Sequence, residues 1–228
     1  YIGPLINEES RRLAAATYLG ANYAWTQVLK RDPAQLKFQV IWIGFWFNLP
    51  GQTLDPTNVA DDFIENGCDV LISGINTTEA LVEAGQFRRR GRQVWAVPYD
   101  CLNAGDEAPE TALGVPYFNW YPIFSKAVLM AQGGTWRQYH DWAGPDWRDI
   151  NDSATSAVGF LKGKGLSPEN GSQLDSFVRD LGDGAVELWS GPLLFQDSSV
   201  FLRAGEQATD QQIFYLPQLL AGMQGKSR

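Results

Sequence analysis

Aromatic and amide side chains follow one apolar stretch of the sequence, at a point where a chain entering a loop normally becomes polar. Val40 to Gly44 reads as a buried strand, and Phe45, Trp46, Phe47 and Asn48 come directly after it. Flat rings stack on planar ligands, and an amide offers both a donor and an acceptor to the edge of a heterocycle. These residue types therefore suit the binding of a small planar molecule.

Polar positions also follow the next two apolar stretches, "DVLISG" and "QVWAVP". In open parallel sheets, ligands bind beyond the carboxyl ends of the strands, so these positions belong to the same edge as the aromatic loop. An aspartate there can accept hydrogen bonds from hydroxyl or N–H groups. The ligand-binding candidates on this edge are Trp46, Asn48, Gly74, Asn76 and Asp100.

Each of these residues also has a purely structural interpretation. The aromatic loop can pack against a neighbouring domain, and at least one of Phe45 and Phe47 is expected to pack into its own lobe. Asn76 begins the segment Asn-Thr-Thr-Glu, which has the spacing of a capping box, so it can serve only to start a helix.

The elements that must position the candidates alternate between strand and helix. Apolar strands are expected at four places, separated by helices with apolar residues at helical spacing: Tyr1–Leu5, Phe38–Gly44, Asp69–Gly74 and Gln93–Pro98. The helices begin at Asn7, at Asp55-Pro56 and at Asn76. This β-α repeat predicts a parallel sheet covered on both faces, with strand order 2-1-3-4 and right-handed crossovers.

The pattern changes after Asp100. Leu113–Phe118 is expected to be extended, and a helix is predicted over Tyr121–Gln132. A strand near Ala157–Leu161 and a helix over Leu166–Leu181 follow, and a hairpin is predicted around Asp197-Ser198. No internal repeat is visible.

Composition and missing motifs exclude several functions. The formal net charge of −8 disfavours nucleic acid or an anionic membrane surface as a partner. No apolar run approaches the ~20 residues of a membrane span, and no signal peptide is visible. No G-x-S-x-G, dinucleotide-binding or P-loop motif occurs. Two cysteines, Cys68 and Cys101, and the single His140 make a metal site improbable, and both thiols are expected to be free because they flank opposite ends of the sheet.

Several stretches together resemble the basic membrane protein (BMP, or PnrA-like) family of substrate-binding lipoproteins of ABC transporters. They are "QVIWIGFWFNLPG", "FIENGCDVLISGINTTEAL", "VWAVPYD", "NWYPIF" and "GGTW", followed by "AVELWSGPL" and "VFLRAGE". Their order spans essentially the whole chain.

This resemblance implies an α/β, type I periplasmic-binding-protein-like fold, in which two lobes joined by hinge strands close on a ligand, without a cofactor. It implies that residues 1–112 form the C-terminal-type lobe, 113–160 the hinge crossing and elements packing toward the other lobe, and 161–228 a return segment with helix, hairpin and tail. Most of the family's N-terminal lobe has no counterpart in this sequence, so the resemblance implies a missing lobe or a partner chain.

The resemblance also assigns roles to the candidates. It implies that Trp46 stacks on the ligand, that Gly74 and Asn76 contact it, and that Asp100 hydrogen-bonds to it. Many members bind purine nucleosides or related purines, and in nucleoside-binding members a lysine at the hinge helps this aspartate to hold the ribose. Phe118 stands at the lysine position, which leaves a free nucleobase or another small planar ligand open.

The resulting hypothesis is an extracytoplasmic solute receptor that feeds an ABC permease, lies in the periplasm or at the cell surface, and is lipid-anchored through an upstream segment. Two alternatives stay open: the ligand-sensing domain of a regulator, and a carboxylate-based enzyme acting on a glycoside with Asp100 as its acid or base. The enzyme interpretation lacks a second well-placed carboxylate.

Overall fold

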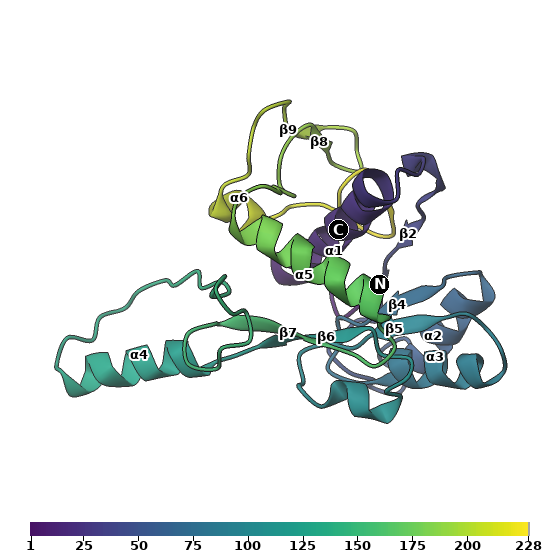
Figure 1. Cartoon of the computed structure of the whole chain (residues 1–228), viewed down its shortest axis with the longest axis horizontal. Helices are drawn as coiled ribbons and strands as arrows, with labels where there is room; N and C mark the ends of the chain where they lie inside the picture. The colour runs from purple at the N-terminus through teal and green to yellow at the C-terminus, as the bar shows by residue number, and fades with distance from the viewer. Residues whose placement is uncertain (228) are drawn as a thin grey trace.

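The structure is a computed structural model, and it describes residues 1–227 (Figure 1). Its first part contains the following helices and strands: β1 (Ile2–Gly3), α1 (Glu8–Tyr23), β2 (Phe38–Gln39), β3 (Ile41–Trp42), α2 (Pro56–Glu65), β4 (Val70–Ile72), α3 (Glu79–Arg89) and β5 (Trp95–Val97). Its second part contains β6 (Gly114–Phe118), α4 (Tyr121–Gln132), β7 (Val158–Lys162), α5 (Pro168–Gly182), β8 (Leu193–Leu194), β9 (Val200–Leu202), α6 (Asp210–Phe214) and β10 (Met223–Gln224).

The central strands are parallel and have the order β3-β1-β4-β5. Strand β1 pairs with β3 through Ile2 and Ile41, and a parallel bridge joins Ile2 to Ser73 at the end of β4. Strand β4 pairs with β5. In order of appearance along the chain this is 2-1-3-4, the order that the β-α repeat predicts.

Two of the three expected helix starts are confirmed, and one is wrong. The Asn7 side chain accepts the Ser10 N–H at the start of α1, and Asp55 accepts the Thr57 N–H at the start of α2. Asn76, however, caps nothing: α3 begins at Glu79, after Thr78, whose side chain makes no capping bond. The Asn76 N–H is bonded to the Trp46 carbonyl, which holds this segment in a loop.

The long second strand predicted from the sequence is divided in two. Strand β3 pairs with β1, whereas β2 pairs in parallel with β10 near the end of the described chain. The two pairings meet at Val40, whose N–H donates to the Gln224 carbonyl. A partner almost two hundred residues away leaves no local signal in the sequence.

Two hydrophobic cores lie on the two faces of the sheet. Helices α2 and α3 cover one face, where buried residues such as Ile2, Phe63 and Leu71 cluster. Helix α1 covers the other, where Tyr1 and Leu19 pack with residues of the C-terminal segment. Because side chains alternate along a strand, the neighbours Tyr1 and Ile2 enter different cores.

The C-terminal segment is an integral part of the second core. Leu216, Leu219 and Leu220 are fully buried there, beside Phe195 of the predicted hairpin. That hairpin is confirmed, since β8 and β9 pair antiparallel around Asp197-Ser198. The Arg11 guanidinium of α1 also donates to the Leu216 carbonyl at 2.7 Å, so α1 is tied to the tail by both apolar and polar contacts.

An arm projects from the body of the molecule (Figure 1). It consists of the antiparallel pair β6–β7, in register from Gly114↔Lys162 to Phe118↔Val158, with α4 beyond it. The bounds of α4 match the sequence prediction, yet none of its residues is buried. The strand β6 runs beside β5 through the parallel bridges Ala96↔Ala112 and Asp100↔Tyr117. The expected role of 113–118 as a hinge stays a prediction.

None of the helices within residues 1–227 combines the length and the hydropathy needed to cross a bilayer.

The thiols provide a first prediction. Cys68 is half-buried and Cys101 is exposed, and both are free. Burial raises the pKa of the Cys68 thiol, which lowers the fraction of the reactive thiolate. In the native protein we therefore expect a thiol reagent to label Cys101 faster than Cys68, and in denaturant without reductant to label both. Protection of both in denaturant, measured by mass spectrometry, contradicts this.

A second prediction concerns the C-terminal core. Leu219→Ala removes a fully buried side chain and is expected to lower the free energy of unfolding by about 2–5 kcal/mol. The matched control is Leu129→Ala on α4, where the side chain is 67% exposed and the change should be close to zero. Urea denaturation measures both. Equal stability of the two variants would show that the tail is not part of the folded core.

Candidate functional site

Three loops meet at the carboxyl edge of the parallel sheet, and we call them together the rim. They are residues 44–48 after β3, residues 73–78 after β4 and residues 98–101 after β5. All of the ligand-binding candidates of the first part of the chain lie in these loops. Phe118 ends the neighbouring strand β6.

The first two rim loops are joined by a hydrogen bond. The Asn76 N–H donates to the Trp46 carbonyl at 2.8 Å, so these two candidates are neighbours through their backbones. Asn76 is exposed and Trp46 is half-buried. Asn76 is therefore accessible to a ligand, next along the rim to the loop that carries Trp46.

The other two rings of this loop do not behave as the sequence suggested. Phe45 and Phe47 pack edge-to-face against each other, with centroids 4.9 Å apart, and they are 37% and 42% exposed. The expectation that at least one packs into the lobe is therefore wrong. Because each ring covers part of the other, both lose some contact with water although neither lies in the core.

Asn48 is engaged within its own loop. Its Oδ1 accepts the Thr53 hydroxyl at 3.2 Å, and the same hydroxyl oxygen accepts the Leu49 N–H at 2.8 Å. These bonds close the Pro-Gly turn after the aromatic run. They leave the amide N–H groups of Asn48 for other partners.

Gly74 is buried, and its lack of a side chain is required by its neighbour. A Cβ at this position would overlap the hydroxyl and ring of Tyr1. The Gly74 N–H donates to the Ile2 carbonyl at 2.8 Å. Gly74 therefore lets Tyr1 lie directly beneath the middle of the rim.

Asp100 adopts a backbone conformation that is uncommon for a residue with a side chain. Its φ is +64°, in the left-handed region where aspartate and asparagine are enriched among non-glycine residues. The Asp100 N–H donates to the Pro116 carbonyl at 3.0 Å, which fixes the residue to β6. Such strained positions are concentrated at functional sites, although local turns also use them.

Phe118 belongs to a series of aromatic rings that leads from the rim onto the arm. It packs edge-to-face on Tyr99, with centroids 6.1 Å apart, and lies 5.9 Å from Trp120. Trp120 in turn stacks on Phe124 of α4. Phe118 is half-buried, so one face of this apolar series borders the Asp100 end of the rim.

The candidates form two groups along the rim. Trp46, Asn48 and Asn76 gather at one end, and Asp100 and Phe118 at the other. Three strand-to-strand intervals separate β3 from β5, which corresponds to about 14 Å. Gly74 and Tyr1 lie between the two groups, so a single ligand has to extend over them to meet both.

The sequence analysis did not select two phenols, those of Tyr1 and Tyr99, as candidates at the Asp100 end of the rim. Burial raises the pKa of the Tyr1 phenol and of the Tyr99 phenol, and each is raised further by the charge of Glu9 in the first turn of α1. Both hydroxyls therefore stay protonated as hydrogen-bond donors. Tyr99 follows β5 as Asp100 does, but the positions of Tyr1 and Glu9 depend on tertiary packing.

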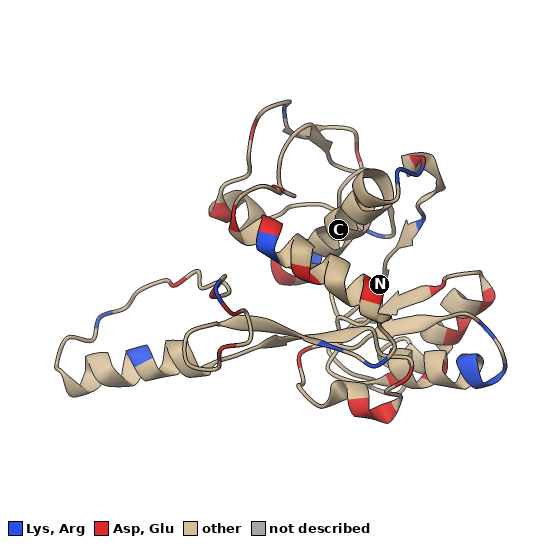
Figure 2. Ribbon diagram, viewed as in Figure 1, with Lys and Arg blue, Asp and Glu red and all other residues tan. Residues whose placement is uncertain are grey.

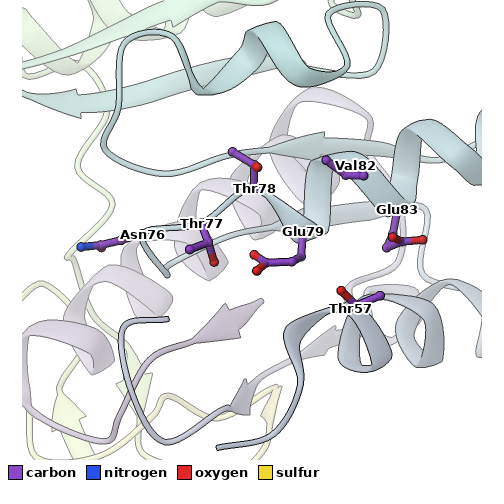
Figure 3. Close-up of a pocket in the computed structure, with 7 residues that line it drawn as sticks. All are labelled: Thr57, Asn76, Thr77, Thr78, Glu79, Val82 and Glu83. Carbon is purple, nitrogen blue, oxygen red and sulfur yellow. The ribbon is translucent and has the colours of Figure 1, made fainter. Parts of the chain in front are cut away.

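A polar pocket of about 460 Å³ adjoins the Asn76 end (Figure 3). It lies between the start of α2 and the start of α3, where Thr57 faces Glu79 and Glu83. Thr77 Oγ1 and Glu79 Oε2 are buried there without a hydrogen-bond partner in residues 1–227. Desolvation raises the pKa of Glu83, with a further contribution from Asp61. Within the described chain, no group of three or more His, Cys, Asp or Glu residues is arranged to hold a metal ion.

Comparisons with known proteins agree with this architecture. No protein-family model matches the chain. The chain is 26% identical over 194 residues to a purine-binding protein of Brucella abortus (strain 2308), a match that covers 83% of this chain and 49% of that protein. Among solved structures, it resembles an ABC transporter solute-binding protein from Conexibacter woesei DSM 14684, with a TM-score of 0.51 and 12% identity over 82% of this chain and 55% of that one.

The chain therefore has the fold of the solute-binding proteins of ABC transporters, of the type I periplasmic-binding class. Its resemblance to the basic membrane protein family is confirmed by the relative and the structural neighbour together. The chain spans about half the length of the Brucella abortus and Conexibacter woesei proteins.

Proposed function

We propose that this chain is the C-terminal-type lobe, with hinge elements, of an extracytoplasmic solute-binding protein that delivers a purine-type ligand to an ABC permease. The observation that carries the proposal is the rim, where Trp46, Asn76 and Asp100 lie at the carboxyl ends of three parallel strands, β3, β4 and β5. Ligand-binding edges of open α/β sheets occupy this place. The purine-binding name of the curated relative supports the choice of ligand.

Trp46 is the proposed stacking residue. Its ring is half-buried and packs face-on or edge-on against no other ring in residues 1–227, whereas Phe45 and Phe47 satisfy each other. A planar ligand between Trp46 and a group from a second lobe completes a sandwich. Closure of the lobes about the hinge is then favoured because the closed form binds the ligand more tightly.

The amide of Asn76 and the carboxylate of Asp100 are the proposed polar contacts. The amide supplies a donor and an acceptor, and the carboxylate supplies acceptors for N–H or hydroxyl donors of the ligand. Asn76 and Asp100 lie toward opposite ends of the rim, so we expect them to contact opposite edges of the ligand. Gly74, at the middle of the rim, leaves the space that the Tyr1 hydroxyl and ring occupy.

Phe118 is the proposed specificity residue. The resemblance places a lysine here in nucleoside-binding members, and this chain presents a ring packed on Tyr99 instead. An apolar ring offers no donor to a ribose hydroxyl. We therefore expect little preference for a nucleoside over its free base.

The arm is the proposed connection to the second lobe. Trp120, Tyr121, Phe124 and Leu129 are between 58% and 67% exposed, a large apolar surface for a soluble protein. The sequence of α4 contains one charged residue, Lys126, whose Nζ lies 2.7 Å from Asp141 Oδ2, and the ribbon of α4 is otherwise uncharged (Figure 2). We propose that residues 113–160 cross to, and pack against, a lobe of the kind that makes up the rest of the relatives' length.

The cellular setting is part of the same proposal. A solute receptor for a permease works outside the cytoplasmic membrane, in the periplasm or at the cell surface. Lipid anchoring through an upstream segment, as in the family, is proposed on the resemblance alone.

Two substitutions test the site. Trp46→Ala removes ring stacking of roughly 0.5–1.5 kcal/mol and a burial contribution of a few kcal/mol, so purine binding should weaken on the order of a hundredfold. Asp100→Asn preserves the left-handed backbone, which asparagine tolerates, but mismatches a hydrogen bond of about 1–3 kcal/mol. Calorimetric titration of purine bases and nucleosides into the protein that carries both lobes measures these losses.

Phe47→Ala is the matched control, because it removes a ring of the same loop that is 42% exposed and packs on the Phe45 ring. Its affinity should stay within about twofold of the wild type. Equal binding by all variants with unchanged melting temperatures means that the rim does not contact the ligand. If no purine binds the wild type, the ligand class is wrong.

A further prediction concerns ligand choice. The wild type should bind a purine base and its nucleoside with similar affinity, because Phe118 has no donor for the ribose. Phe118→Lys introduces a charged donor worth about 1.5–3 kcal/mol, so affinity for the nucleoside alone should rise roughly tenfold or more. Phe118→Leu controls for loss of the ring. A wild type that strongly prefers the nucleoside contradicts the proposal and assigns the ribose to other residues.

A further inference from the structure

A cavity of about 530 Å³ lies on the α1 side of the sheet, apart from the polar pocket. It is partly open to solvent, and most of its lining comes from α1, the strand pair β6–β7, α5 and the segment 145–150 that precedes β7. Leu13 and Ala16 of α1 form one wall, Val178 and Leu181 of α5 form another, and Trp147 contributes to a third. We call it the hinge cavity.

The lining of the hinge cavity contains no charged side chain. Most of its polar side chains are already occupied: Thr17 donates to the Leu13 carbonyl, Ser73 to the Ile75 carbonyl, and Tyr117 to Asn151 Oδ1. The hydroxyls of Tyr1 and Tyr99 are different, because within residues 1–227 neither makes a hydrogen bond. The cavity is thus mainly apolar, and its polar side-chain groups without a hydrogen bond in residues 1–227 are the hydroxyls of Tyr1 and Tyr99 and the indole N–H of Trp147.

The two phenols are protonated at any physiological pH. Burial is the main cause that raises the pKa of Tyr1 and of Tyr99 above the ordinary value for a phenol. A protonated phenol both donates and accepts a hydrogen bond. The cavity therefore provides polar partners for a neutral group and offers no cation or anion to neutralise a charge.

The cavity also has the size and cover of a ligand site. Pockets for small molecules typically measure about 300–1,000 Å³ and are mainly apolar with a few polar groups. On one side of the cavity, Gly182 of α5 packs against the Trp147 side chain, and a Cβ on Gly182 would lie only 3.0 Å from the Trp147 Cβ. Helix α5 and the segment 145–150 are therefore closely packed there.

We propose that the hinge cavity binds a small, uncharged, mainly apolar ring compound that hydrogen-bonds to the hydroxyl of Tyr1 or Tyr99. Burial of a charged group without a partner is costly, so charged analogues are excluded. Such a molecule bridges α1, α5 and the strand pair β6–β7. It therefore binds where the arm joins the body of the protein.

The hinge cavity borders the rim, because the rim residues Ser73 and Tyr99 line it. Of the rim candidates and Phe118, only Phe118 lines the hinge cavity, and Trp46, Asn48, Gly74, Asn76 and Asp100 do not. Tyr99 and Phe118 form the partition between the two. The proposal does not depend on what the rim binds, and variants of Trp46 and of α1 distinguish the two sites.

The test uses indole as the probe, because it is an apolar bicycle with one N–H donor. Ligand-observed NMR and calorimetry measure its binding to the wild-type protein and to variants that fill the cavity. Ala16→Phe places a ring in the cavity from α1, and Val178→Phe places one from α5. Each is expected to weaken indole binding at least tenfold while the protein still unfolds cooperatively at an equal or higher temperature.

The matched controls are Ala131→Phe, the same change at an exposed position of α4, and Trp46→Ala at the rim. Both should bind indole as the wild type does. Indole-3-acetate, which carries a carboxylate, should bind at least tenfold more weakly than indole. The proposal is overturned if the wild type does not bind indole, if either cavity-filling variant folds and binds it as tightly as the wild type, if Trp46→Ala abolishes binding, or if the carboxylate makes no difference.

Discussion

The arrangement of the rim depends on the backbone hydrogen bonds of one very short strand. In β1, the Tyr1 and Gly3 carbonyls accept the N–H groups of Ile41 and Ile43, and the Ile2 carbonyl accepts the N–H of Gly74. Three consecutive residues, Tyr1 and the two of β1, thus join β3 on one side to the end of β4 on the other. Because the aromatic loop follows β3 and Gly74 follows β4, their relative position is fixed by these bonds. The hydrogen bond between Asn76 and Trp46 then closes the two loops onto each other.

Local patterns in the sequence were sufficient to predict most of the helices and strands and the order of the four central strands. The bounds of α4, the caps at Asn7 and Asp55 and the hairpin at Asp197-Ser198 all follow from residues close together in the chain. The strand order follows from apolar strands that alternate with helices. The positions after the strands likewise follow from the rule for parallel sheets.

What the sequence could not provide depends on partners far away in the chain. Asn76 has the local spacing of a cap, but a bond to the aromatic loop overrides it. Phe45 and Phe47 pack against each other instead of entering the core, and the periodicity of the sequence does not predict this. Tyr1 beneath Gly74 and the hinge cavity both require packing between elements that are not neighbours in sequence.

The pairing of β10 with β2 has a consequence for how the chain avoids self-association. The segment "FQVIWIGFWF" is uncharged, rich in β-branched and aromatic residues and free of proline, the composition of segments that form intermolecular β-structure. An open strand edge beside such a segment is a template for another chain. Met223 and Gln224 occupy the edge of β2, and the Val40 N–H is taken by the Gln224 carbonyl. Because β10 is synthesised long after β2, the edge of β2 stays open until this later segment has been made, and protection against aggregation arrives only then.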